Sequence, residues 1–317
     1  MQKNLGKVAL VFGASGFVGS NLIRPMTLNN WRIIVVTRSP YNNNKLKMFG
    51  PPGSIDLDKV FLFDEKEIRR LLKVSDVVIN LCGILNESKR NSFEAIHVRF
   101  PEMLSKLCSE YSNVQKLIHI SALGIEESSA TSNYAKSKLR AEKIIQENYN
   151  KNSVILRPGI IVGLDDKFFN LFGSLCQYLP ALPLIGGGST LMQPVYIDDV
   201  VKSIVAVVEK EEIENNIYEI FGKDQFSFKE LMQLLLKEIK KKRLLLNIPF
   251  PAAKILARFA ELLPKPLLTR DQVELLRYSN CSTGKYPGLD QLNINPTPIT
   301  TVLPKICWRF RKGGQFA

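Results

Sequence analysis

The sequence is poor in the side chains that bind transition metals. Its 317 residues include only two histidines, His97 and His119, and five cysteines that stand far apart without metal-ligand spacing. Two histidines exclude a histidine-rich metal site, and we therefore expect no bound metal. Scattered cysteines in odd number indicate reduced thiols in a cytosol-like compartment. The cysteines are Cys82, Cys108, Cys176, Cys281 and Cys307.

Long apolar runs and an N-terminal targeting pattern are also missing. No apolar stretch approaches the roughly 20 residues that a membrane span needs, and the segment from Met1 to Lys7 does not resemble a signal peptide. We therefore expect a cytoplasmic protein. A composition with 45% hydrophobic and 23% charged residues is typical of a globular chain with a large core.

Acidic residues are scarce, particularly near the start of the chain. There are 43 basic and 30 acidic residues, which give a net charge of +13, and no acidic residue precedes Asp56. Such a charge suits nucleic acid, an anionic membrane surface or an anionic cofactor. Because no nucleic-acid motif appears and aromatic residues do not alternate with the basic ones, we expect no nucleic-acid partner.

A glycine-rich turn follows the first apolar run, which predicts a buried parallel strand. Gly13 lets the chain turn off this strand, Gly16 lets backbone amides approach a diphosphate, and Gly19 lets the next helix pack against the sheet. Ser15 and Phe17 lie between these glycines and complete the predicted cofactor-binding turn. The pattern predicts an α/β protein with a Rossmann-type, doubly wound parallel sheet.

The second predicted strand, residues 32–39, ends in Thr37, Arg38 and Ser39 rather than in an acidic residue. Rossmann sites for NAD usually place Asp or Glu here, and that carboxylate would repel the 2′-phosphate of NADP. A guanidinium group instead pairs well with a phosphate monoester. We predict that Arg38 selects NADP(H) over NAD(H). The alternative is that Arg38 only stacks on the adenine or faces solvent.

Strands and helices alternate further along the chain. We predict strands at residues 60–63 and 116–124, strands with their exit loops at 76–83 and 153–163, and helices at 65–73 and 91–111. Pro101 should kink the second of these helices or split it in two. His97 lies in the same helix, where we expect a packed or hydrogen-bonded residue rather than a catalyst.

Two side chains at helical spacing follow the predicted fifth strand, which ends in Ser121. The helix from Ser132 to Tyr149 carries Tyr134 and Lys138 on one side, because residues i and i+4 share a face. A neighbouring ammonium favours the phenolate of a tyrosine and can hold the nicotinamide ribose. We predict that Tyr134 and Lys138 line the cofactor site. If the protein is an enzyme, Tyr134 would exchange a proton with the substrate, and Lys138 would lower the pKa of Tyr134. Ser121 would donate a hydrogen bond to the substrate oxygen.

The strand–helix alternation loosens after residue 162, which indicates a smaller, mainly helical lobe. We assign 1–162 to an NADP-binding Rossmann core, 163–189 to a substrate-lobe insertion, 190–222 to a return to the Rossmann sheet, and 223–317 to a C-terminal lobe and basic tail. Within the return, residues 193–197 predict a strand that rejoins the sheet. Asp198 or Asp199 would cap the following helix, and residues 216–222 predict a further strand.

An amphipathic segment near the C-terminus is bracketed by basic residues. Residues 249–264 combine six large apolar side chains with two basic ones, between the basic run 237–243 and a basic tail after Asp290. The segment would rest on an anionic membrane surface or a membrane-protein partner, or it would pack on the second lobe. Without such a partner we expect the basic run to be a solvated helix end and the tail to be frayed.

Together these motifs resemble the short-chain dehydrogenase/reductase superfamily in its extended and atypical branches. The resemblance rests on Gly13-x-x-Gly16-x-x-Gly19, the turn at Asn80, Tyr134-x-x-x-Lys138 and Arg157-Pro158-Gly159. Five further segments narrow the resemblance to one branch of this superfamily. They are residues 121–125, 163–170, 183–188, 193–200 and 267–276. That branch contains the nucleotide-binding accessory subunit of respiratory complex I and its bacterial relatives.

The resemblance implies cofactor contacts at the ends of the third and fourth strands. Asp64 matches a residue that bonds the adenine amino group, although it would equally cap the next helix. Asn80, Cys82 and Gly83 resemble a turn in which alanine usually stands before the glycine. Asn80 would stabilise the sheet core, and Gly83 would let the backbone run beside the cofactor.

The sixth strand carries the last implied contacts. Arg157, Pro158 and Gly159 lie where related proteins contact the nicotinamide end of the cofactor. In a purely structural interpretation, Pro158 and Gly159 simply end the strand.

The resemblance also implies a tightly held NADPH and a partner, either a respiratory membrane complex or a protein of quinone metabolism, at the inner face of the cytoplasmic membrane. One departure weighs against turnover. In extended reductases the catalytic hydroxyl lies a residue or two beyond the fifth strand, where this chain has Ala122 and Leu123. The alternatives are a free-standing NADPH-dependent reductase, a sugar-nucleotide epimerase or dehydratase, and a nucleotide-sensing regulator.

Overall fold

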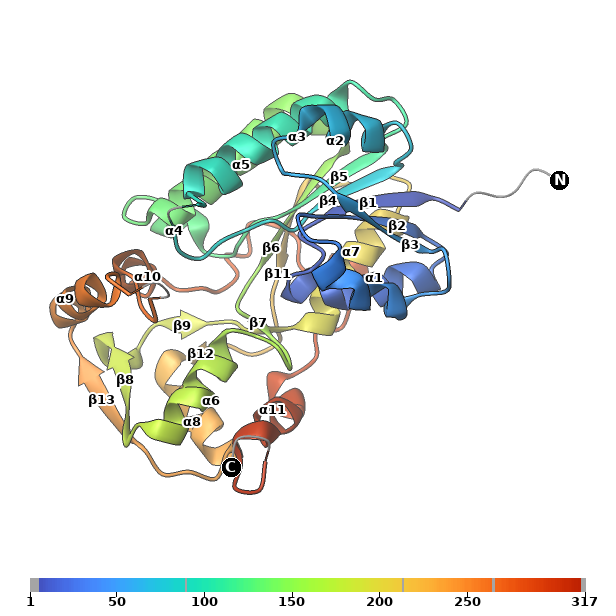
Figure 1. The fold of residues 1–317 in the computed structure, drawn as a ribbon. Coiled ribbons are helices and arrows are strands. Elements are labelled where there is room, and N and C mark those ends of the chain that lie inside the picture. The colour runs from blue at the N-terminus through green and yellow to red at the C-terminus, as the bar shows by residue number, and fades with distance from the viewer. Residues whose placement is uncertain (1–5, 89, 213, 264–265, 315–317) are drawn as a thin grey trace.

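A parallel sheet with helices on both faces forms the larger part of the molecule, and a smaller lobe lies beside it (Figure 1). The computed structural model describes residues 6–88, 90–212, 214–263 and 266–314, so Pro264, the predicted end of the amphipathic segment, lies outside the described residues. The seven strands run in the order β11-β6-β5-β4-β1-β2-β3, and all of their pairings are parallel. This order confirms the predicted Rossmann-type fold. The strands are β1 (Val8–Phe12), β2 (Arg32–Thr37), β3 (Ile55–Lys59), β4 (Val77–Asn80), β5 (Lys116–Ile120), β6 (Ser153–Pro158) and β11 (Ile217–Ile220).

Two apolar layers hold the helices to the sheet, because alternate residues of each buried strand face opposite sides. On one side Ala9 and Val11 of β1 pack with helices α1 and α7. On the other side Leu10 and Phe12 pack with α2, α3 and α5. These helices are α1 (Phe17–Leu28), α2 (Glu65–Leu72), α3 (Phe100–Ser109), α5 (Asn133–Tyr149) and α7 (Ile197–Glu209).

The second lobe has its own apolar core around Phe169, Leu231 and Met232. Its small sheets pair β8 with β13 and β9 with β12. Its elements are α6 (Phe168–Tyr178), β8 (Ala181–Ile185), β9 (Leu191–Met192), β12 (Phe226–Ser227), α8 (Phe228–Glu238), β13 (Leu244–Ile248), α9 (Phe250–Ala260), α10 (Arg270–Leu275) and α11 (Ile299–Cys307).

The helix predicted at residues 91–111 is split near Pro101, as expected. A π-helical turn, η2, comes first, and α3 begins at Phe100, immediately before the proline. The short helical turns of the chain are η1 (Tyr41–Phe49), η2 (Glu94–Arg99), α4 (Ile125–Ser128), η3 (Asn150–Asn152), η4 (Gly186–Gly188), η5 (Asp290–Leu292) and η6 (Trp308–Phe310).

The third strand lies earlier than the sequence analysis predicted. Residues 60–63 form a turn in which Phe61 and Phe63 are exposed, and β3 precedes them. Since β3 is an edge strand, it alternates apolar and charged residues instead of forming a continuous apolar run. The prediction of the third strand at the apolar run 60–63 was therefore wrong, because the strand is formed by residues 55–59.

The strand predicted at residues 193–197 does not rejoin the main sheet. Its core, β10 (Val195–Tyr196), pairs with β7 (Ile161–Val162) in a separate two-stranded sheet. The return to the main sheet occurs at β11, within the strand predicted at 216–222.

The predicted caps and tail also differ from the structure. Neither Asp198 nor Asp199 caps α7, which begins at Ile197. The buried Asp199 carboxylate instead accepts a hydrogen bond of 2.6 Å from the backbone N–H of Thr297, just before α11. The expected frayed tail is folded, because α11 packs on α6 and α8 in the core of the second lobe.

We predict that Gly19→Ala destabilises the protein by about 2 kcal/mol or more, because an added methyl in a close-packed region forces the backbone to shift. A Cβ at Gly19 would lie 2.3 Å from Cα of Ala14. Urea denaturation measures the change. Ser20→Ala, one residue further along the same helix, is the control and should change stability by less than about 1 kcal/mol. Equal stabilities of the two variants would contradict the close contact.

Candidate functional site

The site lies at the carboxyl edge of the sheet, where β1 and β4 are neighbours and the chain leaves them in opposite directions. In open parallel sheets this point leaves a crevice for a ligand. The turn after β1 lies against the turn after β4, since a Cβ at Gly13 would lie 2.9 Å from the carbonyl carbon of Leu81. Gly13 has φ +79°, which a residue with a side chain rarely adopts.

The turn leads into α1 with the features of an anion site. Gly16 is the N-cap residue of α1 and no acidic residue lies in the first turn. Ser15 and Gly16 are exposed, while Phe17 reaches toward Gly163 at the start of the second lobe. A cradle that a Cβ would fill, opening onto a helix N-terminus, fits a dinucleotide diphosphate.

Arg38 is exposed directly after β2. Its guanidinium has no hydrogen bond or ion pair with any residue of the described ranges. Burial raises the pKa of the Cys82 thiol to about 12, against the positive charges of Lys138 and Arg38. Cys82 therefore lies within electrostatic reach of both cations and remains a neutral thiol.

The turn after β4 is held by Asn80, whose side chain is 1% exposed. Its Oδ1 accepts a 3.0 Å hydrogen bond from the N–H of Cys82, and its Nδ2 lies 3.1 Å from Nδ1 of His119 on β5. Asn80 thus ties two strands to the turn. Asp64 caps α2 by accepting a bond from the N–H of Glu67 at 3.3 Å, and it follows a turn rather than a strand.

Tyr134 and Lys138 lie side by side on α5, with His97 opposite them. The rings of His97 and Tyr134 have centroids 5.4 Å apart, and a Cβ at Gly83 would lie 3.4 Å from Nζ of Lys138. Nζ donates a 2.9 Å hydrogen bond to the carbonyl oxygen of Ile120 at the end of β5. The imidazole of His97 is buried and accepts a hydrogen bond from the N–H of Ile84, which confirms that it is packed and hydrogen-bonded.

The pKa of Tyr134 is raised, whereas the sequence analysis expected Lys138 to lower it. Burial, followed by the charge of Asp271, raises the pKa of Tyr134 to about 12. Burial also lowers the pKa of Lys138 to about 8 and that of His97 to about 2. At neutral pH the phenol is therefore protonated and the imidazole is neutral.

Ser121 follows β5 and is 4% exposed. Its Oγ has no hydrogen-bond partner in the part of the chain that the structure describes. A buried hydroxyl without a partner suits a ligand atom that is absent here.

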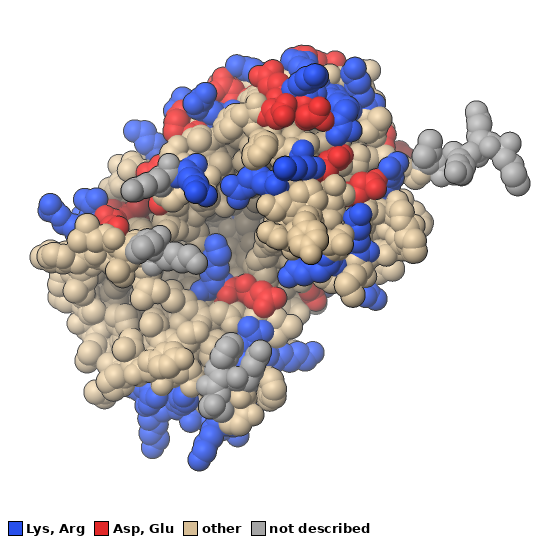
Figure 2. Space-filling view, in the orientation of Figure 1, with Lys and Arg blue, Asp and Glu red and all other residues tan. Residues whose placement is uncertain are grey.

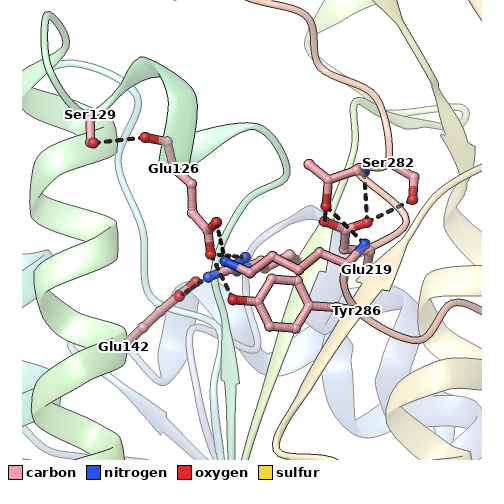
Figure 3. A network of polar contacts seen from close by, with 9 residues as sticks. Glu126, Ser129, Glu142, Glu219, Ser282 and Tyr286 are labelled. Atoms are coloured by element: carbon pink, nitrogen blue, oxygen red, sulfur yellow. Dashed lines mark hydrogen bonds and ion pairs between the residues drawn. The ribbon is translucent and has the colours of Figure 1, made fainter.

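Arg157 belongs to a different cluster, shown in Figure 3. Its guanidinium is held by Glu142 of α5, with an Nη2–Oε2 distance of 2.5 Å, and by Glu126 of α4 at 2.9 Å. The ring of Tyr286 covers it, with the guanidinium carbon 4.6 Å from the ring centroid. The next strand supplies Glu219, whose carboxylate accepts bonds from Ser282 and Thr283 (Figure 3).

This cluster bears on the contacts predicted for the sixth strand. The side chain of Arg157 is used by the two carboxylates, so a contact with nicotinamide would have to come from its backbone. Pro158 ends β6. A Cβ at Gly159 would lie 2.5 Å from the carbonyl oxygen of Gln193, which shows why a glycine follows the strand.

The profile of the NAD dependent epimerase/dehydratase family matches residues 9–220, more than half of the chain. The chain belongs to this family. Its membership supports binding of a nicotinamide dinucleotide.

The chain is also similar to proteins named as subunits of NADH dehydrogenase (ubiquinone). The chain is 29% identical to NADH dehydrogenase (ubiquinone) 1 alpha subcomplex subunit 9 of Arabidopsis thaliana, over 98% of this chain and 79% of that protein. For the Mus musculus protein of the same name the identity is 28%, over 93% and 78%. A solved UDP-glucuronic acid 4-epimerase mutant from Bacillus cereus has the same fold, with a TM-score of 0.72, 18% identity and coverage of 95% and 98%.

Sequence reasoning missed several residues that shape the site of this epimerase/dehydratase-family chain. Glu142 and Asp271 are the clearest cases. A buried arginine in a strand signals that carboxylates must lie nearby, but it does not say which ones. Asp271 lies in a segment that contributed only to the family resemblance, yet it contacts the first turn of α5. Within the described ranges, no group of three or more His, Cys, Asp or Glu is arranged to hold a metal ion.

We predict that Lys138→Met makes the protein about 1–2 kcal/mol more stable at pH 7 and that this gain shrinks by pH 10. Lys138 is 3% exposed, and the folded-state pKa of its ammonium, about 8, lies below the unfolded value of 10.5. Below pH 8 both states are charged, and the folded state bears the full penalty of burial. Between pH 8 and 10.5 the folded protein loses this proton first, so the penalty disappears.

Urea denaturation at pH 7 and pH 10 measures the difference. Lys136→Met, on an exposed side chain of the same helix, is the control and should show little dependence on pH. An advantage of Lys138→Met that is the same at both pH values would contradict the buried ammonium.

Proposed function

We propose that this chain is an NADPH-binding protein that acts as an accessory subunit of a respiratory membrane complex, at the inner face of the membrane. The observation that carries the nucleotide preference is the guanidinium of Arg38 directly after β2, which has no partner in the described part of the chain. The respiratory relatives support the second part, because the similarity to them covers nearly the whole chain.

The positive charge of Arg38 supports a preference for binding NADPH over NADH. Arg38 follows β2, where a carboxylate would favour the ribose hydroxyls of NAD. Since Arg38 has no partner in the described part of the chain, its five N–H donors remain available for a 2′-phosphate. Its charge also reaches Cys82, on the turn that faces Gly13, which supports a location beside the bound dinucleotide.

The groups at the nicotinamide end support tight binding more strongly than turnover. Bound nicotinamide would supply hydride chemistry. Lys138 would hold the ribose, Ser121 would bond a substrate oxygen, and Tyr134 would move the proton. A phenol with a pKa of about 12 in the protein alone is a weak acid and is not ionised at neutral pH.

The retained Tyr134, Lys138 and Ser121 favour a second candidate, a free-standing NADPH-dependent reductase or sugar-nucleotide epimerase. In that case the substrate would enter between the sheet edge and the second lobe. The solved epimerase with the same fold supports this only at the level of architecture.

The exposed side of α9 supports a peripheral contact with an anionic membrane. Ala253 and Ala257 are buried against the lobe, whereas Ile255, Leu256 and Phe259 of α9 are exposed. We call the exposed apolar residues of α9 and of the segment after it the α9 face: Ile255, Leu256, Phe259, Leu262, Leu263 and Leu267. Figure 2 shows a largely uncharged surface over this lobe with basic side chains along its lower border. No helix in the described ranges has the length and apolarity of a membrane span.

We predict that Arg38→Ala weakens NADPH binding by about 10- to 100-fold and leaves NADH binding unchanged, because only NADPH carries the phosphate that the guanidinium would bind. Isothermal titration with each nucleotide measures this. Arg32→Ala, at the start of the same strand and paired with Asp56, is the matched control. Mass spectrometry of nucleotide released from the native protein should identify NADP(H). Tighter NADH binding that is unaffected by Arg38→Ala would refute the preference.

We predict that the protein floats with vesicles containing anionic lipid at low salt and that Phe259→Asp reduces the floating fraction about tenfold. Phe259 is 66% exposed on the α9 face. Leu28→Asp, at an equally exposed apolar side chain on the Rossmann core, is the control and should float like the wild type. Complete recovery of the wild type in the soluble fraction would exclude the membrane contact.

A further inference from the structure

A carboxylate from the second lobe contacts the first turn of the helix that carries Tyr134. Asp271 lies in the first turn of α10, which is opened by a reciprocal cap between Thr269 and Gln272. Its Oδ1 accepts a 2.7 Å hydrogen bond from the N–H of Asn133. Its Oδ2 accepts bonds from the N–H of Tyr134 at 3.2 Å and from Oγ of Ser132 at 2.9 Å.

These contacts complete the start of α5. The first N–H groups of a helix have no acceptor within the helix. Ser132 accepts the bond from the N–H of Ala135, and Asp271 accepts those of Asn133 and Tyr134. A carboxylate at this end also complements the helix dipole. The first turn of α5 is therefore fixed by a residue that lies 137 positions away from Tyr134 in the sequence.

Few charges surround Tyr134. The rings of His97 in η2 and of Phe93 just before η2 pack edge-on against it, and the imidazole is neutral because its pKa is about 2. Lys138 is the cation that shares a face of α5 with Tyr134. Asp271 contributes the negative charge from α10, and this charge opposes formation of a phenolate.

We propose that Asp271 is a positioning residue, which fixes the first turn of α5 and thereby sets the place and the electrostatic surroundings of Tyr134. The inference rests on the proposed function only in treating Tyr134 as a site residue. No contact between Asp271 and a ligand is required, because its three hydrogen bonds all go to residues 132–134.

The test is a titration of the phenol at position 134. Tyr134 is replaced by 3,5-difluorotyrosine, whose phenol ionises near neutral pH, and its fluorine signal is followed by NMR against pH. Asp271→Asn keeps one acceptor oxygen and removes the charge. Removal of a nearby negative charge stabilises the phenolate, so the midpoint should fall by about half a pH unit or more.

Glu274→Gln is the matched control, because it removes one negative charge from the same helix but pairs with Lys254 and Arg277 instead of α5. It should leave the midpoint unchanged. A midpoint in Asp271→Asn equal to that of the wild type would overturn the electrostatic part of the proposal.

Amide hydrogen exchange tests the positional part. Exchange at Asn133 and Tyr134 should become about tenfold faster in Asp271→Asn and stay unchanged in Glu274→Gln. Equal protection in both variants would overturn it. If Asp271→Asn does not fold, Asp271→Ser serves in both measurements, since its hydroxyl can still accept one bond without a charge. Neither measurement uses nucleotide, so a protein that binds no NADPH would refute the proposed function and leave this inference testable.

Discussion

The structure of the site depends on backbone packed directly against backbone at the turn after β1. Gly13 lies against Leu81 of the neighbouring turn, and Gly19 lies against Ala14, with no room for a side chain in either place. The contact of Gly13 with Leu81 follows from the strand order, which makes β1 and β4 neighbours at the centre of the sheet. The N-terminus of α1 therefore lies at the carboxyl edge of the sheet beside the turn after Asn80, and Arg38 follows the neighbouring strand β2.

Helix α5 brings ionisable side chains into the protein interior, and each is balanced in its own way. The ammonium of Lys138 has a carbonyl oxygen as its partner, and its charge is held at the expense of stability. Glu142, one turn later, is neutralised by the buried Arg157. At the start of α5, Asp271 of α10 accepts the hydrogen bonds of the first amides. A functional site commonly keeps such buried charge even where an apolar residue would be more stable.

The sequence alone was enough to predict the structural features that depend on a local pattern of residues. The buried central strands and the helix of Tyr134 and Lys138 were predicted from apolar runs and helical spacing, because burial on both faces and a 3.6-residue period leave clear signals. The edge strand β3 was misplaced, since its half-exposed face gives an alternating pattern beside a stronger apolar run. Partners such as Asp199 with Thr297, Arg157 with Tyr286 and Asp271 with Asn133 lie about a hundred residues or more apart, so no local pattern could indicate them.

The position of β11 has a consequence for how the chain folds. This edge strand follows residues 163–192 of the second lobe, and its buried Glu219 finds its hydroxyl partners only at Ser282 and Thr283, more than 60 residues later. During synthesis, β11 therefore cannot form the hydrogen bonds between Glu219 and these hydroxyl groups until almost the whole polypeptide has left the ribosome. Contacts of such long sequence separation slow folding. The nascent chain should therefore depend on chaperones late in translation, and truncation before Ser282 should leave a collapsed, aggregation-prone intermediate.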